Sequence, residues 1–262
     1  LIGSLTVVVF ASLLKLIFIN TSLGRGKFRL PLYLAGGLLL SLNPLHVYYS
    51  QEIRMYALSA LLSVLSWRLL IRPNNVKLLG HFLVNLLGIF TFYPLIFNLV
   101  SQIVYLIFVD RRSLPKVLWY SFISLFIFLP WLPIFLDQLK GGGYLASSLS
   151  GWGNLSGIVS LKSLILIAIK FQIGRISLYP KQLYEAVSVL LILFQFFILF
   201  LSIRRPSLPL WFFLIIPIFL ATIISLRSPM LGYWRFIFVL PALLGLMVYG
   251  LQLLPMDLGV TN

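Results

Sequence analysis

The sequence predicts an all-α fold, a polytopic transmembrane helical bundle, and three observations predict it. Of the 262 residues, 61% are hydrophobic, and the mean hydropathy is +1.06. Soluble domains are about 45–50% apolar. Apolar runs of about 20 residues recur along the whole chain, and the charged residues collect between them, as spanning helices require. We therefore interpret residues 1–262 as a single integral-membrane domain.

Nine apolar runs are the predicted spans. They are, in order, Ile2–Ile19, Leu30–Tyr48, Met55–Ile71, Leu78–Phe92, Pro94–Val109, Val117–Leu136, Tyr184–Ile203, Leu208–Leu226 and Phe236–Leu254. Only the Tyr93-Pro94 step separates the fourth run from the fifth, which predicts a tight hairpin. A tenth run, Ile158–Ile169, is short and contains Lys162, so it predicts an interfacial helix within a long outer loop over residues 137–183.

Three local signals refine these elements. Asn43 followed by Pro44 is a helix-start signal, because asparagine caps the first turn and proline suits its fixed φ. Pro130 and Pro133 predict a kink or an end near the outer end of the sixth run. The run 141–143 is Gly-Gly-Gly, which predicts a mobile stretch of the outer loop. That loop is either a lid over a substrate or a linker that rests on the membrane.

The chain has a net charge of +15, and most of its basic residues lie in connections between apolar runs. Their placement predicts which side of the membrane each connection faces. The basic residues fall on every second connection: Arg25, Lys27 and Arg29; Arg68, Arg72 and Lys77; Arg111, Arg112 and Lys116; Arg204 and Arg205. The positive-inside tendency places these loops in the cytoplasm. The protein is then a multi-pass plasma- or inner-membrane protein, and the remaining connections face outward. Membrane lipids, and not nucleic acid, are the expected partners of this charge.

Two classes of chemistry are unsupported by the composition. The chain has no cysteine, which rules out thiol chemistry and disulfides. His46 and His81 lie far apart in sequence and on opposite sides of the predicted topology, so a histidine metal cluster is not expected.

The segment from Asn43 to Tyr56 holds Glu52, one of five acidic residues in the chain, followed by Arg54. If the segment is helical from Pro44, Glu52 shares a face with Leu45, Tyr48, Tyr49 and Tyr56. Arg54 then projects roughly 160° away, and the two charges do not pair. Charged groups at membrane depth are costly and mark function. The alternative is that both lie in headgroup water beside a belt of tyrosines.

A second candidate region is the short outer connection from Arg227 to Arg235, which also holds Tyr233 and Trp234. Arginines on a short outer loop are disfavoured by the positive-inside tendency, and a phosphate ligand explains them. The alternative is that Arg235 reaches the interface beside the aromatic residues. Tyr93 either lines the same cavity or belongs to the aromatic belt.

The run of residues 48–58 resembles a signature of polytopic glycosyltransferases of the C-type membrane fold, in the branch related to protein mannosyltransferases and aminoarabinose transferases. That branch often has a Ser-Gln-Glu-x-Arg-x-Tyr segment, which is matched by Ser50, Gln51, Glu52, Arg54 and Tyr56. Residues 91–93 are similar to a Thr-His-Tyr element, with Phe92 in place of the histidine. Further elements follow in the order of the family, namely residues 130–133, Gln138, Trp152, Arg235 and Pro241.

The resemblance implies a membrane glycosyltransferase that transfers a sugar from a polyprenyl- or dolichyl-phosphate-linked donor, on the outer face, to a glycan, lipid or protein acceptor. It implies that Glu52 is a catalytic-site carboxylate that binds the acceptor, the sugar or a divalent cation such as Mg²⁺ or Mn²⁺. The expected donor-phosphate residues are Arg235, Arg54 and Arg227. The expected substrate-binding residues are Tyr49, Gln51, Tyr56, Tyr93 and Tyr233.

The family places its principal carboxylate in the first outer loop, whereas the first acidic residue of this chain is Glu52. The chain also begins at Leu1, inside an apolar run. We therefore expect a further N-terminal span and its acidic loop upstream, and no activity from this fragment alone. The alternative function is a non-enzymatic flippase or transporter, or an accessory membrane subunit, that handles lipid-linked substrates.

Overall fold

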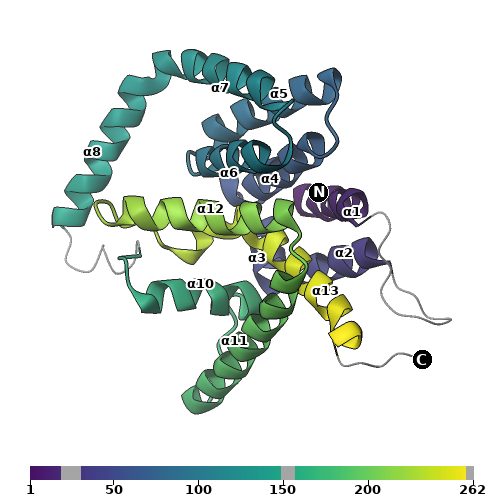
Figure 1. Ribbon diagram of the computed structural model, residues 1–262. Helices are drawn as coiled ribbons and strands as arrows, with labels where there is room; N and C mark the ends of the chain where they lie inside the picture. Colours follow the sequence, from purple (N-terminus) through teal and green to yellow (C-terminus); the bar gives the residue numbers. More distant parts are fainter. Residues whose placement is uncertain (19–30, 149–156, 258–262) are drawn as a thin grey trace.

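The computed structural model describes residues 1–18, 31–148 and 157–257 (Figure 1). The regular elements in these ranges are helices, so the predicted all-α fold is confirmed. The basic segment with Arg25, Lys27 and Arg29 lies outside the described residues, and so does Trp152.

Six helices make up the first part of the chain. They are α1 (Ile2–Ile17), α2 (Leu32–Leu42), α3 (Pro44–Gln51), α4 (Met55–Leu70), α5 (Asn75–Thr91) and α6 (Leu95–Val109). The tight hairpin predicted at Tyr93-Pro94 is present, because α5 ends at Thr91 and α6 begins at Leu95.

The described residues of the second part form six α-helices and two 3₁₀ segments. They are α7 (Leu114–Phe128), η1 (Leu129–Trp131), α8 (Leu132–Ser148), α10 (Leu161–Ile173), α11 (Lys181–Arg204), α12 (Leu208–Ser225), η2 (Tyr233–Val239) and α13 (Leu240–Asp257). Of the two outcomes predicted at Pro130 and Pro133, a kink or an end, the structure has the kink. Pro130 lies in the short 3₁₀ turn η1 and Pro133 in the first turn of α8, and the chain changes direction between α7 and α8 (Figure 1).

The helix lengths support an integral membrane protein with fewer full spans than nine. Within the described residues, four helical segments are long and apolar enough to cross a bilayer: Leu114–Tyr144, Lys181–Arg204, Leu208–Ser225 and Tyr233–Leu254. A fifth is obtained if α3 and α4, which meet at a bend of 119°, are counted as one broken span. The remaining apolar helices α1, α2, α5 and α6 have 11 to 17 residues.

The predicted span Leu30–Tyr48 is wrong, because the chain breaks at Asn43. Asn43 is extended, and its side-chain Oδ1 accepts hydrogen bonds from the backbone N–H groups of Leu45 and His46, both at 3.0 Å. The predicted N-cap is therefore confirmed. Pro44 has no N–H to give to a continuing helix, so a new helix starts there.

The segment 137–183, predicted to be a long outer loop, is largely helical in its described residues. Residues 141–143 are helical and belong to α8, so the predicted mobile glycine stretch is wrong. The start of α8 is held by the hydroxyl of Tyr93, which accepts from Trp131 Nε1 and donates to Gln138 Oε1, both at 2.9 Å. The later part of the segment forms α10, which packs on α3, α11 and η2.

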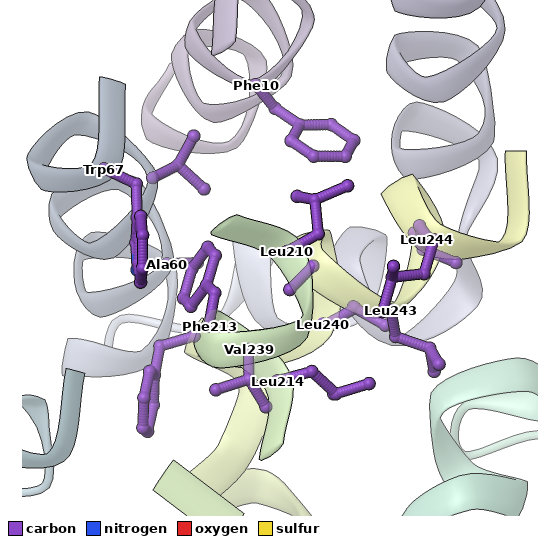
Figure 2. Close-up of a cluster of buried hydrophobic side chains, with 14 of the residues drawn as sticks. Phe10, Ala60, Trp67, Leu210, Phe213, Leu214, Val239, Leu240, Leu243 and Leu244 are labelled. Carbon is purple, nitrogen blue, oxygen red and sulfur yellow. The ribbon is translucent and has the colours of Figure 1, made fainter. Parts of the chain in front are cut away.

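The core of the molecule lies around η2 and α13. Residues of this segment, such as Val239, Leu240 and Leu243, are at most 2% exposed. Figure 2 shows them facing aromatic and aliphatic side chains of α1, α4 and α12, labelled Phe10, Ala60, Trp67, Leu210, Phe213 and Leu214. The central position of η2 matters for the site, because this segment carries Tyr233 and Arg235.

Polar side chains join α4, α5 and α6 in the interior. Trp67 Nε1 donates to Asn98 Oδ1 at 2.8 Å, and Asn98 Nδ2 donates to Ser66 Oγ at 3.0 Å. Gln102 Nε2 also donates to Ser66 Oγ, and its Oε1 lies 2.9 Å from His81 Nε2. In a membrane, burying apolar side chains does not drive helices together, because lipid is equally apolar. Interhelical hydrogen bonds of this kind therefore help to fix how the helices pack.

The two ends of this helical group carry different charged residues. At one end Arg68 Nε donates to Ser12 Oγ at 2.8 Å, and Lys116 Nζ donates to Asn75 Oδ1 at 2.7 Å. The start of α4, directly after Glu52, lies at the other end. Arg68 and Lys116 therefore lie at the end of α4 opposite Glu52.

We expect Asn98→Leu to lower the free energy of unfolding by about 1–2 kcal/mol. It removes two interhelical hydrogen bonds, each worth about 0.6 kcal/mol on average in membranes, and leaves the buried Trp67 N–H without an acceptor. Equilibrium unfolding in mixed detergent micelles measures the loss. Ser101→Ala is the matched control, because the buried Ser101 hydroxyl donates only to a carbonyl of its own helix. An equal loss in both variants would contradict the interhelical role.

Candidate functional site

The end of α10 docks against the start of α3. Asn43 Nδ2 donates to the carbonyl of Phe171 at 2.8 Å. Gly174 follows α10 with a φ of +68°, and a Cβ there would lie 2.9 Å from Pro44 Cβ and 3.0 Å from Leu45 N. Only glycine fits this conformation and this space. The contact directs the next residue, Arg175, toward the far end of the short helix α3.

Glu52 lies in the corner between α3 and α4. The helix ends at Gln51, and Glu52 and Arg54 have extended backbones before α4 begins. Arg54 Nε lies 4.0 Å from Glu52 Oε2. The prediction that the two charges project about 160° apart is therefore wrong, because the helix on which it rested does not continue through residue 52.

Arg175 is the second cation beside Glu52. Its Nη1 lies 3.9 Å from Glu52 Oε1 and also donates to the Tyr48 hydroxyl. Its guanidinium lies over the Tyr48 ring at 4.7 Å. The sequence interpretation did not select Arg175. The available signal was the same as for Arg235, an arginine on a connection predicted to face outward.

Three tyrosines form an aromatic wall from α3 to α4. The ring centroids of Tyr48 and Tyr49 are 5.0 Å apart, and those of Tyr49 and Tyr56 are also 5.0 Å apart, both in edge-to-face geometry. The row continues to Phe92 at the end of α5, 6.0 Å from Tyr56. The wall lies next to Glu52, since the Tyr48 hydroxyl contacts its carboxylate.

The segment η2 adds Tyr233 and Arg235 to this wall. The Tyr49 hydroxyl makes a polar contact with that of Tyr233, and Tyr56 interacts electrostatically with both Arg54 and Arg235. Arg235 Nη1 donates to the Pro229 carbonyl at 2.9 Å.

Two further contacts hold η2 in place. Ser63 Oγ of α4 donates to the Phe238 carbonyl at 2.9 Å. The backbone N–H of Leu231 donates to the Gly157 carbonyl at 3.0 Å. Two connections that lie far apart in sequence, 52–54 and 233–235, are thus held at one corner of the molecule.

Three selected residues lie away from this corner. Gln51 is exposed and lines a groove of about 380 Å³ between α1, α2 and α3. Tyr93 is engaged with Trp131 and Gln138 at the start of α8. Arg227 is exposed beyond the end of α12, and no described contact joins it to Glu52.

The corner favours an anion. It combines one carboxylate with the guanidinium groups of Arg54, Arg175 and Arg235, a formal excess of positive charge. The side chains of Arg54 and Arg175 are 64% and 50% exposed, so they are open to an incoming ligand. Glu52 Oε2 is buried and has no hydrogen-bond donor among the described residues. It is therefore available to a hydroxyl of a ligand.

The same charges do not fit a divalent cation at Glu52. The charged neighbours of this carboxylate are guanidinium groups about 4 Å away, and they repel a cation. Within the described residues, no group of three histidine, aspartate or glutamate side chains is placed to bind a metal. We derive no step through a metal.

Comparison of the chain with models of protein families, with curated proteins and with solved structures finds no match.

We expect Gly174→Ala to lower the free energy of unfolding by about 1–3 kcal/mol, because alanine is strained at positive φ and its Cβ meets Pro44. Gly141→Ala is the matched control: Gly141 is helical, and a Cβ there has nothing within 4 Å. The control should be neutral or stabilising by up to about 1 kcal/mol. Unfolding titrations of both variants measure the difference. Equal stabilities would contradict a docking role for Gly174.

Proposed function

We propose that the protein is a multi-pass membrane glycosyltransferase that transfers a sugar from a polyprenyl- or dolichyl-phosphate-linked donor to a glycan, lipid or protein acceptor on the outer face. The observation that carries the proposal is the grouping of Glu52, Arg54, Arg175 and Arg235 behind a wall of tyrosines. These residues come from separate connections, and their charges suit a phosphate-bearing ligand.

Each group of site residues has its own role in the proposed transfer reaction. Transfer breaks the bond from the anomeric carbon to the donor phosphate oxygen and forms a bond to the acceptor oxygen, whose proton passes to a carboxylate acting as general base. The leaving phosphate keeps the electron pair, and the arginines stabilise its charge. The free Oε2 of Glu52 holds a hydroxyl of the acceptor or the sugar. The tyrosine rings offer flat faces to a sugar ring.

A transporter or flippase of lipid-linked substrates is the second candidate, and the bend of 119° between α3 and α4 favours it. Broken helices with polar groups at the break are a feature of transporter sites. The two candidates differ in their products, because a transporter moves the donor without breaking its glycosidic bond. An accessory subunit needs neither Glu52 nor Arg235.

We expect Glu52→Gln or Arg235→Ala to abolish sugar transfer by the full-length protein, without loss of expression or folding. The first change removes the carboxylate that orients a hydroxyl, and the second removes a charge that stabilises the leaving phosphate. Release of radiolabelled sugar from a lipid-phosphate donor into an acceptor measures transfer. Glu185→Gln is the matched control, because Glu185 is an exposed carboxylate paired with Lys181 at 3.4 Å on α11. Normal transfer by both site variants would overturn the proposal.

A further inference from the structure

A second cavity lies at the end of the molecule opposite Glu52. It has a volume of about 540 Å³ and lies between the starts of α5 and α7. Its lining residues are Asn75, Leu78, Pro115, Lys116, Trp119 and Tyr120. None of the proposed site residues lines it. It is therefore a separate feature that the proposed transfer reaction does not use.

The polar part of this cavity is basic. Lys116 Nζ donates to Asn75 Oδ1 at 2.7 Å, which bridges α7 and α5, and a lysine ammonium has two further donors. Two further basic residues lie close by in sequence, Arg72 before α5 and Lys77 in its first turn, although neither lines the cavity. Lys77 Nζ donates to the Arg72 carbonyl at 3.0 Å. No acidic residue lines the cavity.

The nearest acidic residue in sequence is already engaged. Asp110 lies in the connection before α7, and its carboxylate accepts from Ser113 Oγ at 2.7 Å and from the backbone N–H of Arg112 at 3.2 Å. Both α5 and α7 also begin at the cavity, so the positive ends of two helix dipoles add to the lysine charge.

The apolar part of the cavity continues onto the surface of α7. Trp119 is 62% exposed, and Phe122 and Phe126 follow it along the helix with 60% and 67% exposure. Tyr120 stacks on Phe82 of α5 at 5.3 Å and closes the inner wall. An occupant that fits both parts has an anionic head beside Lys116 and a hydrocarbon tail along α7.

We propose that this cavity binds the phosphate headgroup of an anionic phospholipid, with Lys116 as its main cationic contact and Trp119 at the border between head and tail. Basic cavities between transmembrane helices on the side of the basic loops bind such headgroups. An aromatic residue at the headgroup level is the usual neighbour, because its ring is apolar and its N–H is polar. The inference is independent of the proposed transfer reaction.

The test uses the full-length protein purified in a non-ionic detergent and native mass spectrometry of bound lipid. Dioleoylphosphatidylglycerol is the anionic probe, and dioleoylphosphatidylcholine is the zwitterionic one. We expect preferential retention of the anionic lipid and about fivefold weaker binding to Lys116→Gln, since one surface lysine contributes roughly that factor. Lys116→Arg keeps the charge and should keep the binding, and Trp119→Ala should weaken it.

Lys140→Gln is the matched control. Lys140 is an exposed lysine of α8, paired with Asp137 at 3.4 Å and remote from the cavity, and its loss should leave lipid retention unchanged. Equal retention of the two lipids, or equal losses in Lys116→Gln and Lys140→Gln, would overturn the assignment. Inorganic phosphate that displaced the lipid at matched concentration would assign the cavity to the free anion instead, and would equally overturn it.

Discussion

The short helix α3 is the constraint on which the rest of the Glu52 corner depends. A helix of eight residues leaves about half of its N–H and C=O groups without partners inside the helix, and hydrocarbon offers none. Its start is satisfied by Asn43 and is joined to the end of α10 through the Phe171 carbonyl. Its end opens into the extended corner that carries Glu52. The contacts that complete α3 therefore also bring Arg175 beside Glu52.

The fold class follows from the sequence, but the lengths of the helices do not. In lipid, backbone N–H and C=O groups must form hydrogen bonds within their own segment, so continuous apolar runs predict helices. The structure confirms that these runs are helical. Hydropathy does not show where a helix stops, because the break at Asn43 falls inside the apolar run Leu30–Tyr48. Conversely, residues 141–143 predict mobility by their glycine content, yet the hydrogen bonds of Tyr93 and the continuation of α7 place them in a helix.

The sequence selects several residues that lie together in the structure, but it does not predict their geometry. Glu52, Arg54 and Arg235 were selected because charges between apolar runs are costly, and the structure brings them to one corner. Their pairing could not be predicted, since helical periodicity assigns faces only inside one helix. Arg175 escaped selection because its neighbour in space, Glu52, lies more than a hundred residues away, and the glycine that turns the chain there has no distinctive local pattern.

The arm formed by α7, η1 and α8 has a consequence for the membrane itself. Its segment Leu114–Tyr144 is 31 residues long, and the part without charged side chains lies between Lys116 and Asp137. Those 20 residues correspond to about 30 Å of helix at 1.5 Å per residue, the thickness of the hydrocarbon core of a bilayer. Such a segment matches thinner bilayers by tilting. The buried α13 is packed on several sides and has no such freedom. A change in bilayer thickness therefore alters the tilt of the arm and leaves the packing of α13 unchanged. Mismatch of this kind sorts proteins between thin and thick membranes.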